Sequence, residues 1–283
     1  MPCRVFNFKS YQYIFYDTTV AELVQKITIS KSKVGIPFAF TISNSNIANV
    51  NTVGFKRQRA EFNDLFYQTL QFAGTQTSET TLTPTGIEVG VGVRTGAINR
   101  IYSQGSPKET ENPLDVAIMG KGFFPIQLPD GNIAYTRSGN FKLDDQGNIV
   151  TSEGYLVQPQ ITVPPEAQSI NIGADGTVSV TLGNNGQAEV LGQIQLVNFV
   201  NPAGLHGLGD NLYMNTNASG EPIEGIAGQD GLGQIRAGFL ELSNVRLVSE
   251  MTDLITGQRA YEANSKSIQT ADSMLQTVNG LKR

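Results

Sequence analysis

Residues 44–57 read NSNIANVNTVGFKR, and this stretch sets amide side chains among apolar residues at a helical spacing. Ile47 and Val50 lie three positions apart, which puts them on one face of a helix. Gly54 follows soon after, and glycine readily takes the left-handed backbone in which many helices end. The stretch therefore indicates a helix that stops at a glycine, and it raises the question of what so many asparagines bind.

The residues that follow predict a further amphipathic segment. In FKRQRAEFNDLFYQTLQ, most charged residues lie away from one helical stripe, which consists of Phe55, Phe62, Leu65, Phe66, Thr69 and Leu70. This pattern predicts a helix or a helix end over residues 55–70. Residues 72–112 are rich in Thr, Gly and Gln, and they predict an extended linker or short strands.

Between residue 114 and about residue 200 the apolar residues follow a period of two. Turn sequences interrupt them repeatedly, with PDGN at 129–132, DDQGN at 144–148 and Asp-Gly at 175–176. Pro, Asp and Gly supply the backbone angles that hairpin turns require. The pattern predicts short strands in a compact all-β domain. Residues 201–233 are predicted to be mostly loop.

The chain becomes helical again towards its C-terminus. A heptad-like seam with steps of four and three consists of Leu247, Met251, Leu254, Gln258, Tyr261, Ser265, Ile268, Asp272 and Leu275. About forty residues at ~1.5 Å each form a rod of roughly 60 Å, too long for one small β domain to cover. The seam therefore predicts a partner helix. Gly257, with Ala260 and Ala263 nearby, predicts close approach of another helix, and ordinary packing within the chain is the alternative.

Together these patterns predict an α+β chain, in which terminal helical segments flank a compact all-β central domain and the C-terminal helix is long and coiled-coil-like. The predicted divisions are an atypical segment at 1–40, a helical segment at 41–72, an extended linker at 73–113, a β-rich domain at 114–235 and the C-terminal helix at 236–283.

The composition excludes several classes of function. The formal net charge is -5 and the basic residues are scattered, so we expect no nucleic-acid partner. Cys3 is the single cysteine, so no disulfide can form within the chain. No stretch reaches the roughly 18 apolar residues of a membrane-spanning helix. Residues 1–20 lack the apolar core and cleavage site of a secretory signal, so any export is expected to use another route.

No group of residues predicts catalysis. Asp130, Asp144 and Asp145 lie in predicted hairpin turns, where Asp is a preferred residue, and they do not fit a calcium-binding loop. His206 is the only histidine, and no nucleophile motif accompanies it. The glycines at 90, 92 and 96 miss the register of a dinucleotide-binding loop. We therefore expect no enzyme activity, no cofactor and no metal.

Several stretches together resemble one known family. NIANVNTVGFKRQRAEFNDLFYQTL at 46–70 is similar to the N-terminal signature of bacterial flagellar rod and hook proteins. SNV at 243–245 and QRAYEANSK at 258–266 are similar to their C-terminal signature, and residues 114–159 resemble their shared β domain. Residues 67–93 and the short chain are most similar to the distal rod type. The resemblance covers residues 41–283.

The resemblance implies a structural role. Such subunits are exported unfolded through the flagellar type III export apparatus and assemble in the periplasm into a helical tube, the rod that transmits torque from motor to hook. The implied partners are further copies of this chain, proximal rod proteins, the hook protein or a junction protein, the outer ring proteins that act as a bushing, and the export apparatus. The implied location is the basal body of the flagellum, with the terminal helices as the inner wall and the β domain facing outward.

The resemblance also implies which residues contact neighbouring subunits. The candidates lie at both helical ends: Ile47, Asn49, Val50, Asn51, Gly54, Phe55, Ser243, Asn244, Val245, Leu247, Met251, Leu254, Gln258, Tyr261, Ser265, Ile268 and Leu275. The asparagines at 46, 49 and 51 would form hydrogen bonds or take left-handed backbone near a helix end packed on a neighbour. Gly54 would turn the chain out of the tube wall, and Phe55 would hold the turn.

Residues 1–40 depart from the family pattern, in which a long amphipathic helix runs into the Asn-rich signature. Pro37 prevents a continuous helix through that point. Either this helix has been replaced, or the reading frame or start codon upstream is wrong, and we favour the second explanation. Two other functions stay open: a proximal rod or hook-type subunit, and a secreted β-rich enzyme or glycan-binding module that acts through residues 114–235.

Overall fold

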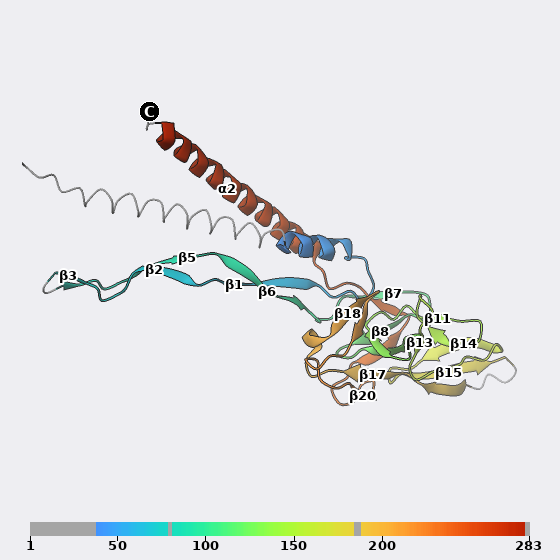
Figure 1. The fold of residues 1–283 in the computed structure, drawn as a ribbon. Coiled ribbons are helices and arrows are strands. Elements are labelled where there is room, and N and C mark those ends of the chain that lie inside the picture. The colour runs from blue at the N-terminus through green and yellow to red at the C-terminus, as the bar shows by residue number, and fades with distance from the viewer. Residues whose placement is uncertain (1–37, 79–80, 184–187, 281–283) are drawn as a thin grey trace, which may run out of the picture. The chain divides into compact units, whose positions relative to one another are not determined.

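A computed structural model describes residues 38–78, 81–183 and 188–280, and these form two compact units (Figure 1). The first, which we call the β unit, contains residues 45–58 and 100–250. The second, which we call the arm unit, contains residues 59–99 and the described parts of 1–44 and 251–283. The predictions for residues 1–37, including the break at Pro37, lie outside the described residues.

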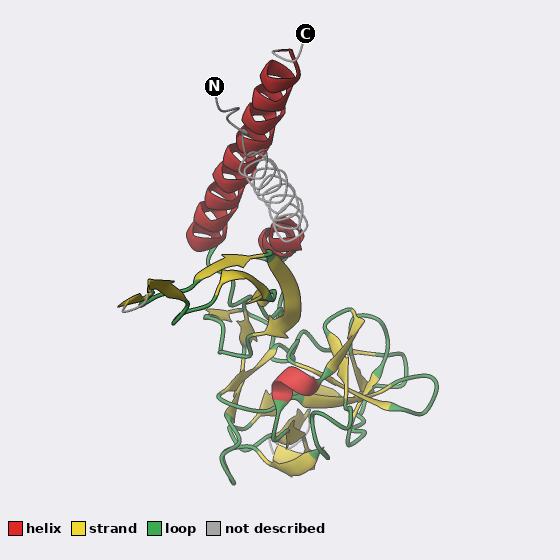
Figure 2. Ribbon diagram, turned by 60° about the vertical axis from the view of Figure 1, so that its left-hand side comes forward, coloured by secondary structure: helices red, strands yellow, loops and turns green. Residues whose placement is uncertain are grey.

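The largest sheet of the β unit has seven antiparallel strands. Strands are yellow in Figure 2. The order of this sheet is β11 (Lys142–Leu143), β12 (Ile149–Val150), β13 (Leu156–Val157), β9 (Phe124–Gln127), β10 (Ile133–Thr136), β19 (Leu212–Met214) and β18 (His206–Gly209). A three-stranded sheet contains β14 (Ala167–Ile172), β15 (Thr177–Leu182) and β16 (Ala188–Gln193). The all-β central domain is therefore confirmed.

Three strand pairs complete the β unit. They are β17 (Gln195–Asn198) with β20 (Ile223–Ile226), β21 (Gln234–Ala237) with β8 (Val116–Met119), and β22 (Phe239–Glu241) with β7 (Pro107–Glu109). A short 3-10 helix spans Pro202–Gly204. Residues 201–233 are mostly loop, as predicted, although the short strands β18, β19 and β20 also lie there.

The aspartates of the turn sequences stabilise turns. The Asp144 carboxylate accepts hydrogen bonds from the backbone N–H groups of Gln146 and Asn148 at 2.9 and 2.7 Å. A further bond from the Asn148 side chain is the main reason why the pKa of Asp144 is lowered. Gly131, with φ of +79°, follows Asp130 in the turn between β9 and β10. Among the described residues, no three His, Cys, Asp or Glu side chains are grouped as a metal site requires.

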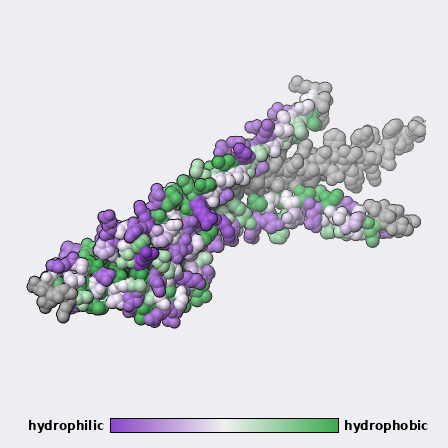
Figure 3. Space-filling model, turned by 180° about the vertical axis from the view of Figure 1, so that it is seen from behind, coloured by the Kyte–Doolittle hydropathy of each residue, from purple (hydrophilic) through white to green (hydrophobic). Residues whose placement is uncertain are grey.

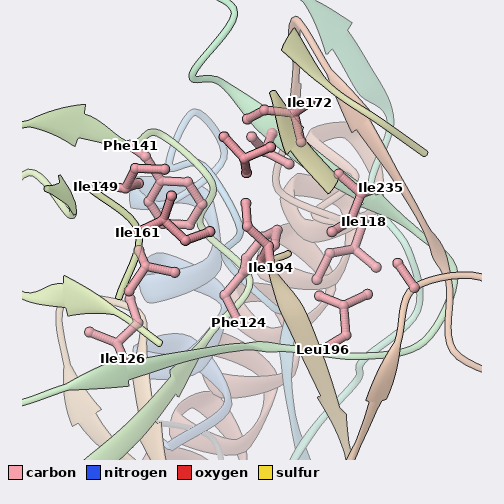
Figure 4. Close-up of a cluster of buried hydrophobic side chains, with 14 of the residues drawn as sticks. Ile118, Phe124, Ile126, Phe141, Ile149, Ile161, Ile172, Ile194, Leu196 and Ile235 are labelled. Carbon is pink, nitrogen blue, oxygen red and sulfur yellow. The ribbon is translucent and has the colours of Figure 1, made fainter. Parts of the chain in front are cut away.

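One core contains isoleucine, leucine, valine and phenylalanine side chains from the seven-stranded sheet, from β14 and β15, from β17 and from the β8–β21 pair (Figure 4). Phe124 and Phe141 pack edge to face, with ring centroids 5.1 Å apart. Ile118, Ile194 and Leu196 are completely buried beside them. Burial of a side chain of this size stabilises a fold by about 1.5–3 kcal/mol, so this core holds the β unit together.

The arm unit contains a long β-hairpin, the hairpin arm (residues 59–99). β1 (Gln58–Asp64) pairs with β6 (Val93–Arg100), β2 (Tyr67–Gln71) with β5 (Ile87–Gly90), and β3 (Gln76–Ser78) with β4 (Thr81–Leu82) (Figure 1). The predicted helix over 55–70 is therefore wrong. Its helical stripe coincided with residues that also favour strands, and pairing with a distant strand outweighs a weak helical pattern.

Two α-helical segments are present in the described residues, besides the short 3-10 helix. Residues 38–48 are helical, and α2 (Leu247–Gly280) is one uninterrupted helix, which confirms the predicted C-terminal helix. A Cβ on Gly257 would lie 3.6 Å from the ring of Phe40, which is an ordinary contact within the arm unit and agrees with the alternative of packing within the chain. None of the described helices is apolar enough over sufficient length to cross a lipid bilayer.

Candidate functional site: a buried polar junction

The chain leaves the helix at 38–48 through a turn that only glycine fits. Gly54 is buried, has φ of +70° and donates its N–H to the carbonyl oxygen of Glu241 at 2.8 Å. A Cβ on this residue would lie 2.7 Å from the Ser138 nitrogen and 2.8 Å from the Arg137 carbonyl carbon. A side chain is excluded by both the left-handed backbone and the lack of room. The helix ends at residue 48, earlier than the predicted stop at the glycine, and Gly54 instead closes the turn that follows at residues 49–54. The turn places the next residues against the β unit's own strands.

Two residues beyond Gly54, a buried ion cluster begins. We call Lys56, Arg137 and Glu241 the junction triad. Lys56 Nζ donates to Glu241 Oε1 at 2.7 Å, and Arg137 Nε donates to Glu241 Oε2 at 2.9 Å. The three residues are 1%, 3% and 1% exposed. The backbone N–H of Gly105 adds a bond to Glu241 Oε1 at 2.8 Å, so the carboxylate is well satisfied.

The burial and charges of the triad shift the pKa values of Lys56 and Glu241. Burial lowers the pKa of Lys56 to about 8, and repulsion by Arg137 adds to the lowering while Glu241 opposes it. Burial would raise the pKa of Glu241, but the combined attraction of Arg137 and Lys56 outweighs it and lowers that pKa. One anion faces two cations, so the carboxylate is held ionised and the triad as a whole has one excess positive charge.

Asn46 answers part of the question about the asparagines. Its side chain is 1% exposed, donates to the Gln58 carbonyl oxygen at 2.8 Å and accepts the Gln58 backbone N–H at 2.9 Å. It also donates to Glu250 Oε2 at 3.1 Å. The Asn46 amide therefore satisfies both backbone polar groups of Gln58, as a neighbouring strand would, and also binds a residue in the first turn of α2.

Asn244 works in the same way from the other end of the chain. It accepts the backbone N–H of Arg57 at 2.7 Å and donates to the carbonyl oxygens of Ile101 and Ser103 at 2.7 and 3.0 Å. Lys56 Nζ binds the same Ser103 carbonyl at 2.9 Å. Side-chain amides and the triad thus join residues 46–58 to residues 241–250 inside the β unit.

The predicted subunit-contact residues divide into two groups. Gly54, Ser243 and Val245 are buried and Asn244 is bonded within the chain, whereas Asn51 is exposed. Asn49 donates to the Ser45 carbonyl oxygen at 2.9 Å, while Ile47, Val50 and Phe55 are half-buried. The left-handed backbone considered for the asparagines belongs to Gly54 instead.

In α2, four of the nine seam positions are half-buried: Leu254, Ser265, Ile268 and Leu275. The other five are exposed: Leu247, Met251, Gln258, Tyr261 and Asp272. Whether any of these residues contacts a neighbouring subunit stays a prediction.

Sequence reasoning misses the junction triad. The helical pattern places Lys56 on the polar side of a helix, and Arg137 and Glu241 are remote from it in the chain. The available signal is a lone acidic residue inside the apolar stretch GFLEL at 238–242. The triad's side chains are buried and Glu241 binds both cations, so the arrangement suits holding two chain segments together.

The chain matches two family models and many known proteins. Residues 117–180 match the flagellar hook protein FlgE/F/G D1 domain, and residues 236–281 match the C-terminal domain of the flagellar basal body rod FlgEFG proteins. Flagellar basal-body rod protein FlgG of Caulobacter vibrioides is 54% identical over 85% of this chain and 92% of its own length. FlgG of Borreliella burgdorferi is 51% identical over 86% and 92%. With the resemblance confirmed over both the β unit and α2, this chain belongs to the FlgG family of flagellar basal-body rod proteins.

Proposed function

We propose that this protein is a structural subunit of the distal rod of the bacterial flagellar basal body, polymerising into a helical tube that transmits torque from motor to hook. Relatives named as flagellar basal-body rod protein FlgG that are 54% and 51% identical support this role. The proposed partners are copies of the same chain, proximal rod proteins, the hook or a junction protein, the outer ring proteins and the type III export apparatus. The proposed location is the periplasm-spanning rod.

The observation that carries polymerisation is the exposed apolar surface of α2. Val248, Met251 and Ile255, at helical steps of three and four, are 78%, 50% and 49% exposed. Met274 and Val278 continue the apolar exposure near the end of the helix. A group of exposed apolar side chains on one helix face indicates that another surface covers them in the assembled protein. Coiled-coil packing by neighbouring copies is the arrangement that matches this spacing.

The hairpin arm supports the same conclusion. Phe66, Tyr67, Phe72 and Leu82 are all more than half exposed, and apolar residues lie at its surface in Figure 3. A two-stranded hairpin has no second layer on which to bury its apolar residues and is marginally stable alone. Packing of the arm on another subunit supplies the missing layer.

The test is assembly of the full chain in vitro, measured by sedimentation and electron microscopy. We expect the triple variant V248Q/M251Q/I255Q to remain monomeric where the unchanged chain polymerises. The matched control D253Q/R259Q changes two exposed residues of the same helix without altering the net charge, and it should assemble normally. Tubes formed by the triple variant would overturn the role of α2.

The position in the flagellum requires native material. Peptide mass spectrometry of purified hook–basal bodies should detect peptides from residues 241–283 in the rod fraction. Peptides from residues 1–40 in the same fraction would favour a replaced N-terminal helix over a misread gene start. Absence of the chain from intact basal bodies would overturn the rod assignment.

A further inference from the structure

One donor of the junction triad is left without a hydrogen-bond partner. Arg137 uses Nε for Glu241 and Nη1 for the carbonyl oxygens of Gly120 and Gly122, at 2.9 and 2.7 Å. Its Nη2 atom is buried and, among the described residues, has no hydrogen-bond acceptor. A buried unsatisfied donor on a charged group is costly, by about 1–3 kcal/mol or more, so this atom marks a place where an acceptor is missing.

The charges of the triad point to an anionic acceptor. Lys56 and Arg137 carry two positive charges, and Glu241 supplies one negative charge at 2.7 and 2.9 Å. All three side chains are at least 96% removed from water, so one positive charge stays uncompensated in the interior. Buried charges are normally paired, because an unpaired ion loses its hydration and gains no attraction in its place.

A pocket of about 260 Å³ opens beside this arginine, within the β unit. Its polar lining is Arg137, Lys121, Asn198 and Tyr102, and its walls include the rings of Phe123 and Phe199. Lys121 is exposed at this lining and adds a second cation. The pocket is smaller than the roughly 300–1,000 Å³ that holds a drug-sized ligand, so its volume suits a single side chain or a small anion.

We propose that this pocket binds a carboxylate, and that in the assembled protein an Asp or Glu side chain of a neighbouring copy of the chain supplies it. Nε and Nη1 of Arg137 are already in use, so Nη2 is the donor that remains, and a carboxylate oxygen would accept a charge-assisted hydrogen bond from it. The chain carries 25 acidic against 20 basic residues, so each copy presents carboxylates to its neighbours. The part of the proposal that names a neighbouring copy as the source of the carboxylate rests on the proposed function. The part that says the pocket binds a carboxylate does not.

The chemistry of the pocket is tested with acetate on the full-length, unassembled chain. Acetate should shift the backbone NMR signals of Gly122, Phe123 and Phe199 saturably, and chloride at equal ionic strength should not. In K121E, which places an anion at the pocket, acetate should bind about tenfold more weakly through charge repulsion. The matched control K142E makes the same charge change at an exposed residue outside the pocket lining and should bind acetate normally.

Equal shifts with acetate and chloride, or equal acetate binding by K121E and K142E, would overturn the proposal. Both variants leave the junction triad intact, so loss of folding does not obscure the result. Binding of acetate with no effect of either variant on assembly would leave a pocket for a free small carboxylate and reject the neighbouring copy as its source.

The source of the carboxylate is tested by assembly. K121E should polymerise about tenfold more slowly than K142E, and excess acetate should slow the unchanged chain relative to chloride. Polymerisation of K121E at the unchanged rate would reject the intersubunit contact while leaving the rod subunit intact. Failure of even the unchanged chain to polymerise would count against the proposed function, and the acetate titration would still decide the chemistry of the pocket.

Discussion

The β unit and the hairpin arm use the same residue type in opposite ways. Phe124 in β9 is completely buried, whereas Phe66, just before β2, is 92% exposed. Phe124 belongs to a short antiparallel ladder, and Phe66 lies between the strands β1 and β2 of the hairpin arm. The difference is the second layer: sheets and strand pairs of the β unit close over Phe124, while the arm is a hairpin with no other ladder of its own unit upon it. A sequence that forms strands therefore does not by itself form a hydrophobic core, because a core also needs a second layer. The stability of the arm depends on the surface against which it packs.

The first prediction compares alanine substitutions of these two phenylalanines. Phe124→Ala should lower the free energy of unfolding of the β unit by about 3–5 kcal/mol, because it leaves a cavity in the core. Phe66→Ala should change that free energy by less than about 0.5 kcal/mol, because the ring is already in water. Urea denaturation of the unassembled full chain measures both. A loss above about 2 kcal/mol in the Phe66 variant, as large as for a half-buried core residue, would show that the arm has a covered face.

The second prediction concerns charge rather than apolar burial. Glu241→Gln leaves Lys56 and Arg137 as two uncompensated buried cations, so the β unit should lose about 3–5 kcal/mol of unfolding free energy. Glu224→Gln makes the same change at an exposed strand residue and should have almost no effect. Equal denaturation midpoints for the two variants would show that water already solvates the triad.

The sequence predicted most of the β unit for a clear physical reason. Its turns depend on local chemistry, such as Asp144 and Gly131, and its strands on a period of two that a single window reveals. The C-terminal helix was equally accessible, because its pattern extends over many turns. The hairpin arm was predicted wrongly at residues 55–70, because the pairing of β1 with β6 and of β2 with β5 is not encoded within either strand.

The candidate site was predictable only at its edges. Asn-rich sequence before Gly54 and the SNV stretch at 243–245 indicated that both ends of the chain carry special contacts. The triad itself depends on Lys56, Arg137 and Glu241 meeting in space, and these residues are separated by at least 81 positions. No local pattern predicts such a meeting, and only the lone glutamate in an apolar stretch pointed to a buried partner.

The third prediction sharpens the role of the glycine turn. Gly54→Ala forces a left-handed alanine and also brings Cβ within 2.7 Å of the Ser138 backbone nitrogen. Gly131 has a similar φ of +79°, but a Cβ added there would meet no heavy atom within 4 Å, so Gly131→Ala measures backbone strain alone. We expect Gly54→Ala to lower the unfolding free energy by about 1–3 kcal/mol more than Gly131→Ala. Equal losses of unfolding free energy in the two variants would mean that the backbone around Ser138 moves aside for the added Cβ at almost no cost.

The fourth prediction concerns how the unfolding free energy of the β unit depends on pH. The pKa of Lys56 is about 8 in the folded β unit against an ordinary value of 10.5. Between these values the unfolded chain binds more protons than the folded chain, so unfolding free energy rises with pH. The rise should reach about 1–2 kcal/mol between about pH 8 and pH 9.5, below the range in which tyrosines titrate.

Lys56→Met isolates the contribution of Lys56 to this pH dependence, because the variant keeps the pair of Arg137 and Glu241 and removes only the titrating ammonium. Unfolding free energy measured by urea at the same two pH values should therefore rise less in the variant than in the unchanged chain. Signals from the hairpin arm should show no such difference, because the lysine belongs to the β unit. If the variant and the unchanged chain respond equally, Lys56 keeps its ordinary pKa. The carboxylate of Glu241 then compensates the ammonium fully, and the unbalanced charge of the triad resides on Arg137 alone.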